Sequence, residues 1–317
     1  MTGGTEAMTN HSSLFLPALF LVIASAACAE RAPECPPAEG VALQVLGSGG
    51  PIADDGRASS GYIVWVDGKS RVLVDMGGGT FLRFGEAGAS FVDLDFIGLS
   101  HFHTDHSADF PALLKSGNFS GRERPLPVAG PGPGGPFLGL GAWLESMFAA
   151  GSGAYGYLSG YLDGSGRLVK LLPAEIGRET AEPVRVLNGE ITVDALPVPH
   201  GIVPALGFRV TTADTSIVFG SDQNGSSEAF IEFASGATAL VMHLPVPEDA
   251  MGTALQLHAR PSRVASIADG AGAGTLVLSH FMARSLRDLD ANVDVVRSGY
   301  DGKVIVAEDL TCVVVRD

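Results

Sequence analysis

Basic residues are scarce in this chain, and no stretch of it is rich in Lys or Arg. The 317 residues contain 20 Lys and Arg against 35 Asp and Glu, which gives a formal net charge of −15. A chain with this balance repels a polyanion unless basic side chains gather locally. The composition therefore argues against a nucleic acid as partner.

The sequence also has no apolar run long enough for a comfortable membrane span. The longest run, residues 14–27, has 14 residues, whereas a span needs about 20. Cys28 follows it, a pattern typical of a secretory signal, although no Lys or Arg precedes the run. We expect residues 1–28 to be a signal peptide, with or without lipidation of Cys28, and residues 29–40 to be a linker. The protein would then be a bacterial periplasmic or outer-membrane lipoprotein that touches the membrane only through this anchor; the alternative is an apolar anchor that is never cleaved.

Only three cysteines are present, and Cys35 and Cys312 are the two that remain once Cys28 is removed or lipidated. An oxidising compartment would allow them to pair, which would tie the N-terminal extension to the end of the chain. Two unpaired thiols are the alternative, because the sequence cannot place their Cα atoms within bridging distance.

The rest of the composition is that of a globular enzyme. With 46% hydrophobic and 17% charged residues, the chain can bury one large core or two modest ones. The 42 glycines and 19 prolines are spread along it, as in a loop-rich α/β protein.

Three of the eight histidines fall within six residues, in the segment His101-Phe-His103-Thr-Asp105-His106. Imidazole and carboxylate are ligands that suit Zn, Fe and Mn. Residues two apart in an extended segment point the same way, so His101 and His103 can reach one cation while Asp105 and His106 turn toward a second. Histidines that merely satisfy a core come singly, and the cluster therefore predicts a metal site.

This HxHxDH pattern resembles the metallo-β-lactamase superfamily, and other segments resemble its ribonuclease Z and arylsulfatase branch. They are the glycine-rich turn 46–51, segments 57–62 and 73–80, Pro199-His200, segment 219–222 and segment 276–280. The resemblance runs from about Val41 to the C-terminus. It implies one hydrolase domain over residues 41–317, with an α/β (α+β) fold of the four-layer αββα sandwich type. Gln223 and Leu244 depart from the family, which has Thr and Glu there, and this puts the support of the ligands in question.

The resemblance also implies a ligand set for two divalent cations, Zn first and Mn or Fe as alternatives. The first cation would take His101, His103 and His200, the second would take Asp105, His106 and His280, and Asp222 would lie between them. Two cations about 3.5–4 Å apart can share a water and hold it as a bridging hydroxide, the nucleophile of a hydrolase.

Proton transfer needs a further group. Asp105 and His258 are the catalytic candidates, His258 as the acid that protonates the leaving group. The alternative for His258 is a surface or helix-capping histidine. Two further positions have open roles: His243 either supports the ligands or is simply packed, and Asp75 either orients the ligand loops or ends a strand.

We expect the substrate to be a small-molecule ester of the sulfate-ester or phosphodiester type. Transfer RNA 3′-end cleavage, as in ribonuclease Z, is the alternative. The acidic charge opposes it, and so does the short segment 201–221, where that branch usually carries an RNA-gripping arm. β-Lactam or lactone hydrolysis and a non-catalytic metal-binding role are also open, as is a homodimer. Residues 130–164 are either an apolar lid beside the metals or a helix packed on the sandwich with a glycine-rich loop.

Local patterns place the elements around these motifs. Apolar runs bounded by turn residues predict strands, and a proline in a first turn predicts a helix start. The predicted strands are 41–46, 61–67, 71–75, 95–99, 183–187, 191–197, 205–211, 215–219, 239–243 and 275–278, and the predicted helices are 107–115, with Pro111 in its first turn, and 261–271.

Overall fold

The computed structural model describes residues 1–4 and 35–315. The chain divides into two units, Met1–Ala32 and Pro33–Asp317, and every helix and strand among the described residues belongs to the second. The predicted signal segment falls largely on residues 5–34, which lie outside the described part. Within the described part, no helix is both long and apolar enough to cross a bilayer.

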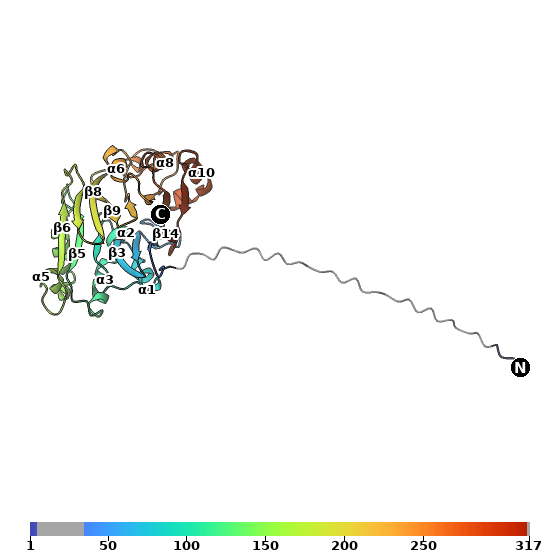
Figure 1. The fold of residues 1–317 in the computed structure, drawn as a ribbon, viewed down its shortest axis with the longest axis horizontal. Helices are drawn as coiled ribbons and strands as arrows, with labels where there is room; N and C mark the ends of the chain where they lie inside the picture. Colours follow the sequence, from blue (N-terminus) through green and yellow to red (C-terminus); the bar gives the residue numbers. More distant parts are fainter. Residues whose placement is uncertain (5–34, 316–317) are drawn as a thin grey trace. The chain divides into compact units, whose positions relative to one another are not determined.

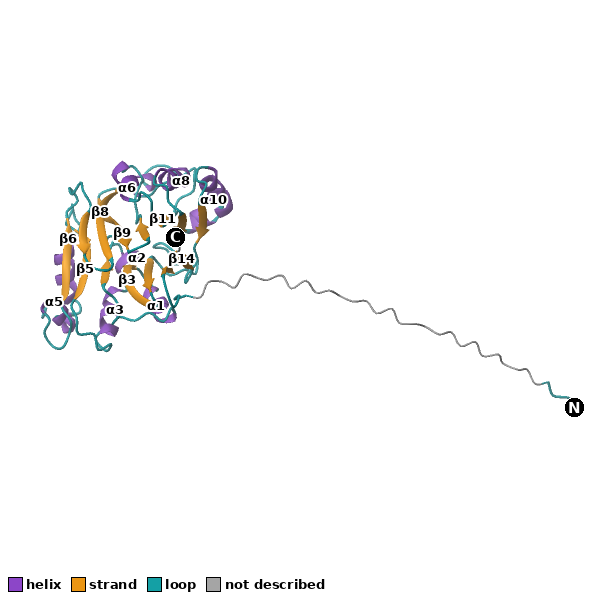
Figure 2. Ribbon diagram, in the orientation of Figure 1, coloured by secondary structure: helices purple, strands orange, loops and turns teal. Residues whose placement is uncertain are grey.

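Two seven-stranded mixed sheets form the centre of the second unit (Figures 1 and 2). In spatial order, the first sheet contains β14 (Cys312–Val315), β1 (Val41–Gly47), β2 (Gly61–Val66), β3 (Lys69–Met76), β4 (Phe96–Gly98), β5 (Leu126–Pro131) and β6 (Leu171–Ile176). In the same way, the second contains β13 (Lys303–Val306), β12 (Thr275–Ser279), β11 (Ala239–His243), β10 (Ser216–Phe219), β9 (Val203–Thr211), β8 (Thr192–His200) and β7 (Val184–Leu187). In each sheet one half pairs antiparallel and the other half, β3 to β6 or β10 to β13, pairs parallel.

Helices cover the outer face of each sheet. The first sheet carries α1 (Thr80–Glu86), α3 (Phe110–Gly117), α4 (Leu140–Phe148) and α5 (Gly160–Asp163), and the second carries α6 (Glu228–Phe233), α8 (Pro261–Gly270) and α10 (Leu289–Ser298). Figure 1 shows the two sets of helices on opposite sides of the paired sheets. Short helices lie in the connections: α2 (Thr104–Ser107), the 3-10 turn η1 (Gly156–Leu158), α7 (Ala254–Leu257) and α9 (Ala283–Leu286).

Strand β1 shows how the sequence builds these layers. Successive side chains of a strand point to opposite faces, so a strand buried on both faces needs an apolar run without polar alternation. Leu43 lies in the core between the two sheets with Phe208 of β9, while Leu46 lies in the outer core with Phe110 of α3. A third core packs the second sheet against α6, α8 and α10. Three apolar cores thus separate four layers, and the expected αββα sandwich is confirmed.

Two residues of the predicted linker are bonded to residues of the sandwich domain. Cys35 forms a disulfide with Cys312 at a Cα–Cα distance of 6.0 Å, so the first of the two alternatives for these cysteines holds. The backbone N–H of Gly40 donates to Asp67 Oδ1 at 2.8 Å. The described end of the predicted linker is therefore fixed to the sandwich.

Candidate metal centre

The candidate ligands lie where strands of both sheets end. The segment from His101 to His106 follows β4 of the first sheet, and His103 is the residue that precedes the first turn of α2. The other candidates come from the second sheet: His200 ends β8, Asp222 follows β10, His243 ends β11 and His280 follows β12. Loops at the ends of buried strands combine a rigid support with freedom to carry function.

One group of ligand atoms contains His101, His103, His200 and Asp222, all within 4.8 Å of one another. Asp222 Oδ2 lies 3.7 Å from His200 Nε2 and 4.0 Å from His101 Nε2. These are the residues that the sequence assigned to a first cation together with the shared aspartate.

A second group contains His106, Asp222, His243 and His280 within the same distance. Asp105 borders it, because Asp105 Oδ2 lies 3.2 Å from His280 Nε2 and 3.6 Å from His106 Nε2. Asp105 is the residue expected for the second cation, and His243 is the residue whose role the sequence leaves open. His243 belongs to this second group of ligand atoms, and Asp105 lies beside it.

His106 is oriented by Asp75, at the end of β3. Its Nδ1 donates to Asp75 Oδ2 at 2.8 Å, while Ser100 donates its backbone N–H and its hydroxyl to the same carboxylate at 2.7 and 2.8 Å. The Nε2 of His106 thereby faces the centre of the site, 3.2 Å from His280 Nε2. Asp75 thus orients the ligand loop, as the resemblance implied, through bonds typical of the residues behind metal-binding histidines.

His200 is the clearest indication that a cation fits here. Its Nδ1 donates to the carbonyl of Leu257 at 2.8 Å, so the ring proton sits on Nδ1 and the lone pair on Nε2. This Nε2 is buried and has no hydrogen-bond partner. A buried polar atom without a partner is costly, and a divalent cation would supply the partner.

Burial and neighbouring charges shift the pKa values of the aspartate and histidine side chains in the site. Burial opposes an ionised Asp222, but the histidines His280 and His258 outweigh it and hold the pKa of this carboxyl well below its ordinary value. Burial also opposes a charged His106, yet Asp75 and Asp105 raise its pKa to about 9. Burial lowers the pKa of His101 well below its ordinary value, which keeps a neutral ligand nitrogen.

Three residues of the site hold a backbone conformation that is rare outside glycine. The φ angles are +60° at Asp75, +57° at Ser221 and +54° at His280. Left-handed backbone of this kind costs roughly 1–3 kcal/mol per residue and persists where the surrounding fold fixes it. Asp75 and His280 belong to the site, and Ser221 directly precedes Asp222.

Aromatic rings border the site on the side of His103, which is half-buried. The ring of Phe137 lies 6.2 Å from that of His103, and Phe102 stacks on Trp143 of α4 at 4.6 Å. Helix α4 also buries Leu140 in the outer core of the first sheet. Of the two interpretations of residues 130–164, the packed helix is the one that describes α4. Its Trp143 contacts the ligand loop through Phe102.

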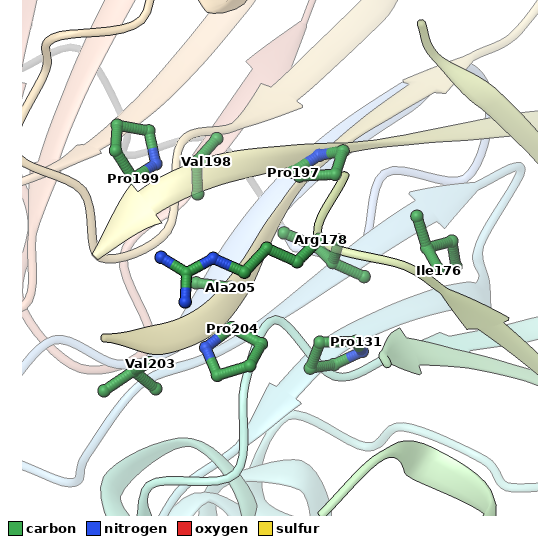
Figure 3. A pocket seen from close by; sticks show the side chains of 10 residues that line it. Pro131, Ile176, Arg178, Pro197, Val198, Pro199, Val203, Pro204 and Ala205 are labelled. Carbon is green, nitrogen blue, oxygen red and sulfur yellow. The ribbon is translucent and has the colours of Figure 1, made fainter. Parts of the chain in front are cut away.

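A small cavity of about 210 Å³ lies beside the hairpin of β8 and β9 (Figure 3). It is lined mainly by apolar side chains, among them Pro131, Pro197, Pro199 and Pro204. Arg178 crosses it, and its guanidinium donates to the carbonyls of residues 201 and 202 at 3.1 and 3.3 Å. Arg178 thus holds the turn that directly follows His200.

Sequence reasoning missed Tyr62, a side chain that lies behind the site. Tyr62 of β2 lies with its hydroxyl 3.0 Å from His243 Nε2 and 3.1 Å from Ser279 Oγ, and His243 Nδ1 donates to Asp222 Oδ1 at 2.7 Å. The sequence carried no local signal for this set, because Tyr62 and His243 belong to different sheets and are 181 residues apart.

The comparisons with known proteins agree with this geometry. The family profile of the β-lactamase superfamily domain matches residues 70–281. The ribonuclease Z of Mycobacterium bovis (strain BCG / Pasteur 1173P2) is 29% identical over 252 residues, which cover 76% of this chain and 85% of the relative.

Two solved structures share the fold. The metallo-β-lactamase fold protein YhfI from Bacillus subtilis superposes with a TM-score of 0.66 at 21% identity, covering 86% of this chain and 98% of that one. The short form of human tRNase Z superposes with a TM-score of 0.66 at 18% identity, covering 87% and 100%. The chain belongs to the metallo-β-lactamase superfamily. Within it, the chain is a ribonuclease Z-like, metal-dependent hydrolase.

Proposed function

We propose that this protein is a dinuclear metal-dependent phosphodiesterase of the ribonuclease Z type. The observation that carries the proposal is the pair of ligand groups that share Asp222, in a chain similar over 252 residues to proteins named ribonuclease Z. We therefore favour ribonuclease Z-like phosphodiester cleavage, the alternative stated from the sequence, over sulfate-ester hydrolysis, for which the comparisons offer no support. When bound, two divalent cations would supply Lewis acidity and a water acidified toward neutral pH.

The two ligand groups support a set of ligands for each cation. His101, His103 and His200 would hold the first, Asp105, His106 and His280 the second, and Asp222 both. We propose Zn, because imidazole nitrogens with a few carboxylate oxygens suit it, and Mn or Fe as replacements. Asp105, whose Oδ2 lies 3.2 Å from His280 Nε2, would also hold a proton of the attacking water.

His258 is the proposed proton donor to the leaving group. Its Nδ1 lies 3.6 Å from Asp222 Oδ1 and has no hydrogen-bond partner, and the residue is only 7% exposed. Burial lowers the pKa of His258 to about 3 in the substrate-free site. The anionic phosphodiester would raise the pKa of His258, so that His258 would take up from solvent the proton that it then donates to the leaving group.

A small phosphodiester is the second candidate substrate. Its support is the short connection between His200 and Asp222, which contains only the hairpin β9–β10 and its turns. The apolar cavity beside the hairpin of β8 and β9 and the net charge of −15 also favour a small or short substrate over a long polyanion.

The test is a substrate panel with the chain stripped of metal and reloaded with Zn or Mn. We expect cleavage of bis(p-nitrophenyl) phosphate, and cleavage of precursor tRNA if RNA is the substrate, with both lost on chelation. A His101→Ala variant should lose the activity while keeping the fold. Turnover of an aryl sulfate, a cephalosporin or a lactone without any phosphodiester would show the proposal to be wrong.

We also propose that the protein works outside the cytoplasm, as the N-terminal sequence pattern predicts. The disulfide between Cys35 and Cys312 supports this, because structural disulfides persist in oxidising compartments. Fractionation of cells that express the full chain would test it. Recovery of the protein in the cytoplasm with free thiols would contradict it.

A further inference from the structure

Tyr62 is a buried phenol at the seam between the two sheets. It is 1% exposed, and its hydroxyl reaches across from β2 to His243, at the end of β11, and to Ser279, at the end of β12. Nothing in the proposed reaction uses this side chain. It is nevertheless linked, through His243, to the aspartate that the two ligand groups share.

The ionised carboxylate of Asp222 fixes the direction of the two hydrogen bonds that His243 makes. An ionised carboxylate can only accept, so the bond of 2.7 Å between His243 and Asp222 Oδ1 requires the proton on His243 Nδ1. A neutral imidazole with its proton on Nδ1 has only a lone pair on Nε2. The Tyr62 hydroxyl, 3.0 Å from that Nε2, must then be the donor, and it shares its proton with Ser279 Oγ, to which it also donates at 3.1 Å.

This direction decides between two roles for His243. Its ligand atom lies within 4.8 Å of those of His106, Asp222 and His280, so by distance alone His243 could bind the second cation. A nitrogen that carries a proton cannot bind a cation, and the other nitrogen is occupied by the phenol. Asp105 then remains the acidic ligand on this side.

We propose that Tyr62 is a positioning residue, which keeps the His243 proton on Nδ1 so that His243 holds Asp222 and does not bind the metal. The inference rests on the proposed metal-binding role of the site. With Oδ1 held by His243, Asp222 turns its Oδ2 toward both ligand groups, 3.7 Å from His200 Nε2 and 3.7 Å from His106 Nε2. Tyr62 thus fixes, through His243, which carboxylate oxygen of Asp222 faces His200 and His106.

The first measurement is the protonation of the His243 ring in the full chain labelled with ¹⁵N-histidine. Long-range ¹H–¹⁵N correlation spectra should show the proton on Nδ1, both in the metal-free and in the Zn-loaded protein. A proton on Nε2, or a Zn-bound nitrogen of His243, would overturn the inference. The metal-free spectrum gives this answer even if the protein binds no metal, an outcome that would instead contradict the proposed function.

The second measurement compares Tyr62→Phe with Tyr161→Phe. Tyr161 is equally buried, but its hydroxyl donates to the carbonyl of Leu114, outside the site. Loss of a partner behind a metal site typically weakens metal affinity 10- to 100-fold. We expect this loss for Tyr62→Phe in a competition titration with a Zn chelator, together with a changed Co(II) absorption spectrum, and no change for Tyr161→Phe.

Equal Zn affinity and equal Co(II) spectra for Tyr62→Phe and the unaltered chain would overturn the role of Tyr62. A Tyr62→Phe chain that does not fold would be recognised by its circular dichroism. The ring protonation measured in the unaltered chain would then decide alone.

Discussion

The carboxylate of Asp75 lies 2.8 Å from His106 Nδ1, although 31 residues separate them in the chain. Because β3 pairs parallel with β4, the end of one strand meets the loop that follows the other. Asp75 holds this loop through Ser100 as well as through His106. One carboxylate therefore sets both the path of the ligand loop and the ring orientation of a ligand.

Asp75→Asn should weaken metal binding without unfolding the domain. The amide offers Ser100 and His106 only one acceptor oxygen and places donors against them. We expect a 10- to 100-fold loss of affinity for the second cation, measured by chelator competition. Asp67→Asn is the matched control, since Asp67 bonds Gly40 at a distant turn; equal losses in both variants would contradict this role.

Reduction of the Cys35–Cys312 disulfide should destabilise the domain markedly. The bridge closes a loop over a sequence separation of 277. Native disulfides contribute about 2–5 kcal/mol, and more for long loops in the chain-entropy account. Urea unfolding of the oxidised chain and of Cys35→Ala/Cys312→Ala should differ by about this amount, and coincident curves would show that the bridge does not form.

The metal-free domain should lose stability as the pH falls below about 6.5. Burial lowers the pKa of His258 to about 3 and that of His243 to about 4. In the unfolded chain both histidines take up a proton at the ordinary histidine pKa near 6.5, whereas in the folded chain they stay neutral down to about pH 4. The free energy of unfolding therefore rises with pH between about 4 and 6.5. Each unmatched proton contributes up to about 1.4 kcal/mol per pH unit.

Urea unfolding at pH 7, 6 and 5 in the presence of a chelator measures this slope. His258→Asn removes one of the two groups and should flatten it. An identical slope in the variant would show that His258 titrates normally in the folded domain.

Gly77→Ala should damage the site through the backbone. A Cβ at this position would lie 2.1 Å from the carbonyl oxygen of Asp105, so the ligand loop would have to move. Forced contacts of this kind cost roughly 1–3 kcal/mol, and we expect weaker Zn binding beside the lower stability. Gly85→Ala, in α1 with no atom within 4 Å of the added methyl group, is the control and should not lower stability.

Much of the fold was predictable because apolar runs marked the buried strands. Strands β1, β2, β9 and β11 start and end close to the predicted positions, since such runs end at turn residues. Strands β5 and β6 were not predicted. Both contain proline, which is tolerated at an edge such as β6 and hides the strand pattern.

The candidate site was predictable where its residues are neighbours in the chain or match the family. His101, His103 and His106 form one motif, and Asp222 and His280 match segments of the superfamily. The contact of Tyr62 with His243 depends on how the two sheets stack. No local pattern encodes that, and the same holds for the bond of His200 to Leu257.

Each ligand group draws on both halves of the sandwich. His101 and His106 follow a strand of the first sheet, whereas His200, Asp222, His243 and His280 come from the second. Neither half alone supplies a complete ligand group. During synthesis, the first group is therefore complete only after residue 222 and the second only after residue 280, so most of the domain exists before both groups can form.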